Sequence, residues 1–149
     1  MIKIYTYGGV TGNGKLDSKG ANAFLVFNKE SRYESVEFCK STTNNREELK
    51  AIINSLLYIL PIKEENSPIT LHSDSQYCVK GITDWMHSWK KKNWMRGVKP
   101  ILNKDLWTTV YNLYSSFPKL EIKWVKGHSG DKWNDYVDNL CTTKIEDNK

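Results

Sequence analysis

Apolar and polar residues alternate in the first segment of the chain, residues 2–7. Its even-numbered positions are Ile, Ile and Thr and its odd-numbered positions are Lys, Tyr and Tyr, so the two sets face opposite sides of an extended strand. Tyr7 stands at the exit of this strand, before a glycine-rich turn over residues 8–20. Further strands are predicted at residues 23–27 and 34–39, which gives an antiparallel meander.

A helix is predicted over residues 44–60, because the apolar residues recur at the spacing of one helical face. Asn44 with Glu47 predicts a capping box at its start, and Pro61 prevents its continuation. Glu48 borders the apolar face and is expected to point toward the sheet, although a solvent-exposed glutamate is the alternative. The apolar set is Leu49, Ile52, Ile53, Leu56, Leu57 and Leu60.

The second half of the chain continues with alternating strands and helices. A strand over residues 69–74 ends at Asp74, for which a role as a helix cap is the simpler alternative. Asn103 is expected to cap a helix that ends before Pro118. A fifth strand is then predicted at residues 120–125.

A last helix is predicted after a loop at residues 126–130, with Asn134 and Asp138 on one flank of its apolar face. The polar tail, residues 144–149, is expected to fray, so the ordered core would span about residues 2–143. This order of elements predicts an α/β fold with a mixed five-stranded sheet, in which three antiparallel strands are followed by parallel additions and flanked by helices. The length of 149 residues suits a single domain.

The charge balance indicates an anionic partner if the excess is clustered. Lys and Arg number 22 against 17 Asp and Glu, which gives a formal net charge of +5. Three widely spaced cysteines support neither a disulfide framework nor a zinc site, so a reducing cytoplasm is expected. No apolar run approaches the roughly 20 residues that a membrane span needs. We therefore expect a soluble cytoplasmic monomer with no membrane partner.

Indole and cationic side chains interleave between residues 81 and 107, where most of the charge excess lies. Such a segment suits a surface that tracks phosphates and offers flat apolar platforms, although an ordinary solvated face is the alternative. Its members are Trp85, His87, Trp89, Lys90, Lys91, Lys92, Trp94, Arg96, Lys99 and Trp107.

Five motifs follow one another along the chain. They are TTNNREEL at residues 42–49, DSQY at 74–77, DWMHSWKK at 84–91, WVKGHSG at 124–130, and Asn134 with Asp138. In this order and spacing the chain resembles the type 1 ribonucleases H of the bacterial kind, whose first motif reads TTNNRxEL and whose third is a basic handle. The resemblance covers nearly the whole chain.

The resemblance implies hydrolysis of the RNA strand of an RNA/DNA hybrid, with two Mg²⁺ ions held by four carboxylates. Glu48 and Asp74 would hold one ion and Asp138 the other. His128, on its loop, would move a proton or help product to leave.

The resemblance also implies how a hybrid would be recognised. Four amide side chains would read the minor groove, where RNA displays its 2′-hydroxyls: Asn13, Asn44, Asn45 and Gln76. Thr43 would bind a DNA phosphate, and Trp85 would lie against a deoxyribose. The cations of the handle would supply the salt-dependent attraction: Lys90, Lys91, Lys92 and Arg96.

One position departs from the family pattern, in which the first strand ends in T-D-G. Here Tyr7 stands where the bridging aspartate is expected. A phenol is neutral at pH 7 and a poor ligand for Mg²⁺. We therefore expect this chain to bind hybrids but to cleave them slowly or not at all with Mg²⁺, and metal occupancy itself is in question. Asp17 in the glycine-rich loop is a weak candidate for a substitute ligand.

Three other interpretations stay open. The chain would be a hybrid-binding scaffold without catalysis, or a nuclease with altered preferences, such as Mn²⁺-dependent or junction-resolving cleavage. The handle and the TTNN motif disfavour junction resolution. Alternatively, Tyr7 is a change introduced at the DNA level.

Overall fold

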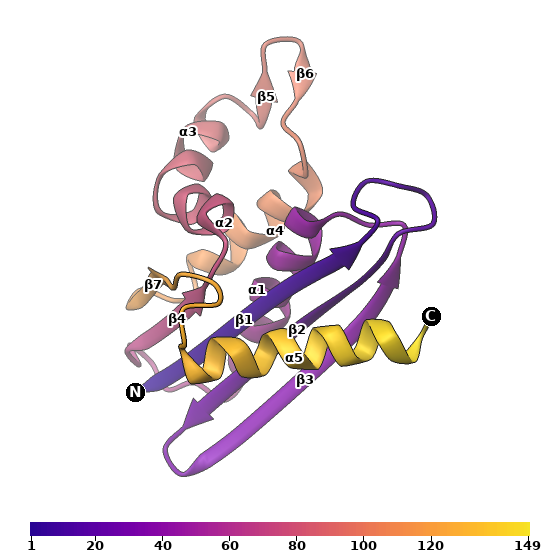
Figure 1. Cartoon of the computed structure of the whole chain (residues 1–149). Coiled ribbons are helices and arrows are strands. Elements are labelled where there is room, and N and C mark those ends of the chain that lie inside the picture. The colour runs from indigo at the N-terminus through magenta and orange to yellow at the C-terminus, as the bar shows by residue number, and fades with distance from the viewer.

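A mixed five-stranded sheet forms the centre of the protein in the computed structural model, which describes residues 1–149 (Figure 1). The strand order is β3-β2-β1-β4-β7. The first three strands pair antiparallel, whereas β1 pairs with β4 and β4 with β7 in parallel. The strands are β1 (Ile2–Thr11), β2 (Lys19–Asn28), β3 (Ser31–Lys40), β4 (Ile69–Ser73) and β7 (Leu120–Trp124). The predicted sheet is confirmed, with longer first strands than predicted.

Helices cover both faces of this sheet. α1 (Asn44–Ile59) packs on one face, with α4 (Lys104–Tyr114) against α1, and α5 (Lys132–Asp147) crosses the other face (Figure 1). The face under α1 receives Ile2 and Ile4, both buried, because alternate side chains of β1 point to that side. Under α5 the sheet presents small residues such as Ala21 and Ala23, which let the helix lie close.

Helix boundaries differ from the sequence predictions in three places. Thr43, not Asn44, is the N-cap of α1, and its hydroxyl accepts from the Arg46 N–H. Asn103 precedes α4 in a left-handed conformation, but its side chain makes no capping bond. The last helix runs to Asp147 and buries Ile145, so the prediction of a frayed tail from Lys144 is wrong.

The handle is the projection between β4 and α4 (Figure 1). It consists of α2 (Gln76–Lys80), the π-helical turn η1 (Gly81–Trp85), α3 (Met86–Lys91) and a short hairpin of β5 (Met95–Arg96) and β6 (Lys99–Pro100). Its π-helical turn packs against the buried ring of Trp107. Position 81 requires glycine because a Cβ would overlap that ring.

Two side chains in the interleaved segment belong to the core instead of the surface. Trp94 is nearly wholly buried, which corrects its predicted role as an exposed platform. Trp107 is wholly buried on the apolar face of α4. The three cysteines, Cys39, Cys78 and Cys141, are all free, as predicted. None of the helices combines the length and apolar character that crossing a membrane requires.

Candidate active site and nucleic-acid interface

Tyr7 and Asp74 reach the same edge of the sheet. Thr6 and Ser73 are register partners in the parallel pair β1 and β4, so the next residue on each strand emerges beside the other. Asp74 does not cap α2, because Ser75 takes that role by accepting from the Cys78 N–H at 3.1 Å. The alternative explanation of Asp74 as a helix cap is therefore wrong.

Glu48 reaches this edge from α1, which covers the face of the sheet opposite to α5. Its carboxylate is buried and accepts a hydrogen bond from the Gly8 N–H. Gly8 has no room for a side chain, since a Cβ would overlap the backbone of Glu47 and Glu48. The first turn of α1 thus lies directly against β1, which confirms that Glu48 points toward the sheet.

Asp74 has neighbours from two elements. Its backbone carbonyl accepts from Trp124 Nε1 at 3.2 Å, and its carboxyl lies near enough to that of Glu48 for the two to influence each other's pKa. Gly127 passes so close that a Cβ there would lie 3.1 Å from Asp74 Oδ2.

Asp138 joins the group from α5. Its Oδ1 accepts from the Thr142 hydroxyl at 3.2 Å, and its Oδ2 lies 3.7 Å from His128 Nδ1. The His128 side chain is 81% exposed and its backbone has a positive φ of 56°, so the ring stands at the open side of the site. Asn134, one turn earlier on α5, is buried.

Tyr7 lies near enough to the three acids for their charges to act on its phenol. Burial raises the pKa of its phenol, and the charges of Asp138, Asp74 and Glu48 raise it further, so the hydroxyl is neutral at physiological pH. Its ring edge lies against Gly9, where a Cβ would come within 3.1 Å of it. With Cys141, Thr142 and Ile145 the ring also lines a small hollow of about 140 Å³.

The carboxyls of the site repel one another. The pKa of Glu48 is raised well above its usual range, first by burial and then by the charge of Asp74 and the hydrogen bond shared with it. Burial also raises the pKa of Asp74, with the charge of Asp138 adding to it and the Glu48 bond opposing it. Glu48 therefore holds the proton of the pair.

Because Glu48 holds this proton, the stability of the fold should depend on pH. A carboxyl with a raised pKa contributes stability that is complete below its unfolded pKa, about 4.3 for glutamate, and lost as the pH rises through its folded pKa. Glu48→Gln mimics the protonated state, so in urea unfolding it should be more stable than the unaltered protein at pH 8 and equal near pH 4. The exposed residue Glu146, changed to Gln, is the control and should show no such pH-dependent difference. A gain from Glu48→Gln that does not depend on pH would contradict this explanation.

The ligand groups of the site determine whether a divalent cation fits it. Carboxylates are the ligands that Mg²⁺ prefers. No three carboxylate, imidazole or thiolate groups of the chain are placed so that they could hold one ion together. Tyr7 adds no carboxylate to the three acids, and its phenol is neutral because burial and their charges raise its pKa. The residues as arranged therefore do not form a centre for two ions.

The predicted hybrid-reading residues lie at the start of α1 and on the loop between β1 and β2. The Asn44 N–H donates to Asn13 Oδ1 at 3.0 Å, which joins the two segments. Thr43 is half-buried as the N-cap, and Asn45 is half-buried beside it. Gln76 is exposed at the start of α2. Asp17 lies exposed in the loop and is not among the charges that shift the pKa of Glu48 or Asp74.

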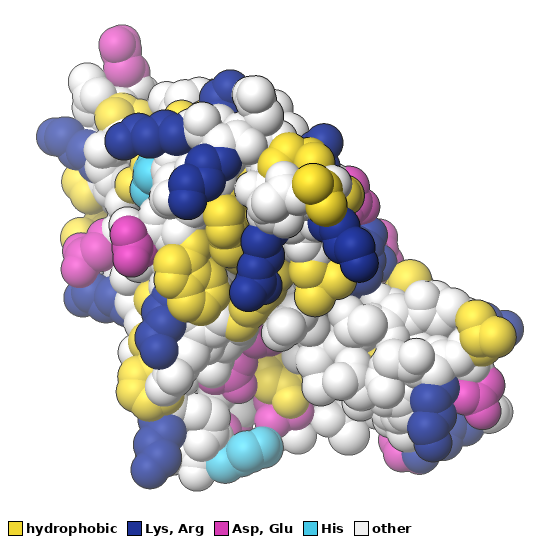
Figure 2. Space-filling model, turned by 90° about the horizontal axis from the view of Figure 1, so that it is seen from above, with side chains coloured by type: hydrophobic (Ala, Val, Ile, Leu, Met, Phe, Trp, Pro, Cys, Tyr) yellow, Lys and Arg dark blue, Asp and Glu magenta, His cyan; other side chains and the backbone are white.

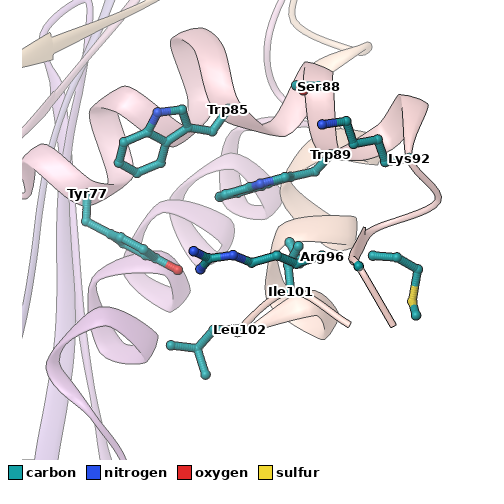
Figure 3. A pocket seen from close by; sticks show the side chains of 10 residues that line it. Tyr77, Trp85, Ser88, Trp89, Lys92, Arg96, Ile101 and Leu102 are labelled. Carbon is teal, nitrogen blue, oxygen red and sulfur yellow. The ribbon is translucent and has the colours of Figure 1, made fainter. Parts of the chain in front are cut away.

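The handle contains a pocket of about 670 Å³ that has no acidic residue in its lining. Trp85 and Trp89 lie with ring centres 5.9 Å apart on one wall. Figure 3 shows Arg96 extending between Trp89 and Tyr77. Lys90, Lys91 and Lys92 are exposed, and Lys92 lines the pocket. Viewed from above, Lys and Arg side chains gather around hydrophobic ones over the handle (Figure 2).

Several residues of this surface were not predicted from the sequence. The Tyr77 hydroxyl accepts from Trp107 Nε1 at 2.8 Å and from Asn103 Nδ2 at 3.2 Å, which ties the pocket wall to α4. Arg46 binds Asp105 through two hydrogen bonds of 3.0 and 2.8 Å, which ties α1 to α4. Tyr77 and Arg46 lie inside the motifs, and that position was their only signal.

The family model and the similar sequences identify one and the same family. The RNase H family model matches residues 1–146. The chain is 39% identical over 147 residues to "Ribonuclease H" of Mannheimia succiniciproducens, covering 98% of this chain and 88% of that protein. It is 38% identical over 147 residues to "Ribonuclease H" of Nitrosospira multiformis, covering 98% of this chain and 90% of that protein.

Solved structures share the fold. LC9-RNase H1, described as a type 1 RNase H with the type 2 active-site motif, aligns with a TM-score of 0.84 and 26% identity over 99% of this chain and 73% of that one. LC11-RNase H1 in complex with an RNA/DNA hybrid aligns with a TM-score of 0.74 and 19% identity over 99% of this chain and 98% of that one. The second likeness shows the fold alone.

Proposed function

Because the chain belongs to the ribonuclease H family, hydrolases that act on the RNA of RNA/DNA hybrids, we propose that it binds such hybrids and that Tyr7 limits their cleavage. The observation that carries this proposal is the neutral Tyr7 phenol, whose pKa is raised by burial and by the charges of Asp138, Asp74 and Glu48. Family members would carry an aspartate at this position, and the phenol offers neither its charge nor its small size.

In the family scheme, Glu48 and Asp74 would hold one Mg²⁺ and Asp138 the other, and such ions activate water and stabilise the leaving oxygen. The present arrangement of the acids does not fit that centre. What the chain's own residues do is different: the raised pKa of Glu48 favours its protonated form beside Asp74, and the Tyr7 ring lies between β1 and α5. His128 Nδ1 lies 3.7 Å from Asp138 Oδ2, so a protonated His128 would form an ion pair with that carboxylate.

Hybrid binding would use two surfaces. The amide edge, defined as Asn13, Asn44, Asn45 and Gln76, would read the minor groove of the RNA strand. Thr43 would bind a DNA phosphate. Trp85 and the handle cations would lie along the DNA backbone, where contacts position a duplex without reading its sequence. The pocket between Trp85 and Arg96, free of acids, supports this assignment.

The handle predicts a salt dependence. Changing Lys90, Lys91, Lys92 and Arg96 together to Ala should weaken hybrid binding and reduce the slope of log affinity against log salt by about 0.9 for each phosphate that the variant no longer neutralises. Fluorescence anisotropy with a labelled hybrid measures both quantities.

The control for this experiment removes four exposed lysines outside the handle, Lys3, Lys29, Lys119 and Lys123, and so lowers the net charge equally. It should leave the slope nearly unchanged. Equal effects of the two variants would show that net charge, not the handle, drives binding.

A substrate panel tests the proposed function as a whole. The unaltered chain should bind an RNA/DNA hybrid more tightly than double-stranded DNA of the same sequence, because DNA lacks the 2′-hydroxyls that the amide edge would read. Its cleavage of the hybrid in Mg²⁺ should be slow or absent. Equal affinity for both duplexes would contradict the assignment of the amide edge.

A further inference from the structure

Glu47 is a buried carboxylate that none of the site chemistry uses. Its side chain is wholly buried in the first turn of α1, next to Glu48. It fills the position that the pattern TTNNRxEL leaves unspecified. A buried charge is costly unless it is paired and hydrogen-bonded, so its partners indicate what it holds in place.

Three parts of the chain donate to this carboxylate. Oε2 accepts from the Thr42 hydroxyl at 2.7 Å and from Lys50 Nζ at 2.9 Å. Oε1 accepts from the Asn22 amide on β2 at 3.1 Å. Burial lowers the pKa of Lys50, but the hydrogen bond and charge of Glu47 more than offset this and raise it. Glu47 thus connects the segment before α1, the helix itself and the sheet.

Asn22 extends this connection across the sheet. Its amide also donates to Glu37 Oε1 on β3 at 3.1 Å, and its oxygen accepts from the Asn54 amide at 3.0 Å. Both polar ends of Asn22 are therefore satisfied, and its position is determined from two sides. A carboxylate bound to such a fixed donor is itself held in one position.

Thr42 passes the constraint to the loop between β1 and β2. Its N–H donates to the Ser18 hydroxyl at 2.8 Å, and that hydroxyl donates to the Thr42 carbonyl at 2.9 Å. Two residues further on, the Asn44 N–H donates to Asn13 Oδ1. The loop and the start of α1 are thus joined at two points, and the amide edge stands on both segments.

We propose that Glu47 is a positioning residue for the amide edge, which holds Asn13, Asn44 and Asn45 in register for the RNA strand of a hybrid. This inference rests on the proposed hybrid binding. Glu47 itself is buried and touches no nucleic acid, so its effect would pass through Thr42 and Ser18. The handle takes no part in this network and would keep its affinity for the phosphate backbone.

The proposal differs from a general structural role in what it changes. Replacing a residue that only stabilises the fold would lower the melting temperature without altering the ratio of affinities for hybrid and double-stranded DNA. Replacing a positioning residue should lower that ratio, because only the amide edge distinguishes the two duplexes. Its replacement should also release the Thr42 and Asn44 N–H groups, whose acceptors, Ser18 and Asn13, lie in the loop that the network would hold in place.

The test compares Glu47→Gln and Thr42→Val with Thr42→Ser and Ile59→Val. Glu47→Gln keeps the shape but places an amide against Lys50, and Thr42→Val removes only the hydroxyl donor. Thr42→Ser restores that donor. Ile59 is wholly buried at the far end of α1, so Ile59→Val lowers stability away from the network.

Two readouts are measured below the melting temperature of every variant: the ratio of affinities for hybrid and double-stranded DNA, and amide hydrogen exchange at Thr42 and Asn44. Glu47→Gln and Thr42→Val should lower the ratio and speed the exchange about tenfold, the scale of one charge-assisted hydrogen bond. Thr42→Ser and Ile59→Val should change neither readout.

The two proposals fail in different ways. If the unaltered chain does not prefer the hybrid, the proposed function fails, and hydrogen exchange still decides whether Glu47 positions the amide edge. If Glu47→Gln leaves exchange at Thr42 and Asn44 unchanged, or alters the affinity ratio no more than Ile59→Val, the positioning role is overturned.

Discussion

Replacing Tyr7 with Asp is expected to raise Mg²⁺-dependent cleavage of the RNA strand at least about 100-fold, since a bound metal supplies several kcal/mol to such a reaction. The change supplies a fourth carboxylate near Glu48, Asp74 and Asp138 and removes the neutral phenol. Single-turnover cleavage of a hybrid with end-labelled RNA measures the effect. Hybrid affinity should change little, because the amide edge and the handle are untouched.

Two controls separate charge from size. Tyr7→Asn has nearly the shape of the aspartate but no charge, and Tyr7→Phe keeps the ring and loses only the hydroxyl. Neither should restore cleavage if a carboxylate is what the site lacks. Restoration by Tyr7→Asn equal to that by Tyr7→Asp would instead show that the bulk of the phenol is the whole obstacle.

Gly8→Ala is expected to destabilise the fold by about 3 kcal/mol or more, at the upper end of the usual cost of overpacking. The added Cβ would lie 2.6 Å from the Glu47 carbonyl oxygen and would overlap the backbone of Glu48. The backbone of one helical turn cannot move without the rest of the helix, so the whole of α1 would have to shift away from β1. Urea unfolding measures the decrease in stability.

Gly9→Ala is the matched control on the same strand. There a Cβ meets only the ring edge of Tyr7, at 3.1 Å, and a side chain can move more easily than a helix. Its cost should be clearly smaller than that of Gly8→Ala. If the two costs are equal, the close approach of α1 to β1 is not what requires glycine at position 8.

The sheet and its order were predictable because period-two alternation and helical spacing are strong local signals. Segment 2–7 placed its side chains as predicted, and so did Leu49, Ile52, Ile53 and Leu56 of α1. Leu57 and Leu60, predicted for the same apolar face, are exposed. Glu48 was predictable for the same reason, since it borders that apolar face. Its position at the sheet edge follows from α1 lying directly against Gly8.

The features that were missed depend on residues distant in sequence. Nothing local distinguishes Trp94, which is buried, from Trp85, which is exposed. Capping roles shifted because Thr43 and Ser75 compete with their neighbours Asn44 and Asp74, and the backbone geometry decides between them. The tail stays helical because Ile145 packs under the sheet with Cys141, an arrangement that a polar composition conceals.

The most direct measurement follows one labelled hybrid in a single sample with the unaltered chain and Mg²⁺. A native gel records the complex, and a denaturing gel of the same sample records the length of the RNA strand. We predict a shifted complex that contains full-length RNA, under conditions in which Tyr7→Asp cuts it. Rapid and complete cleavage by the unaltered chain, with no gain from Tyr7→Asp, would contradict the role assigned to Tyr7.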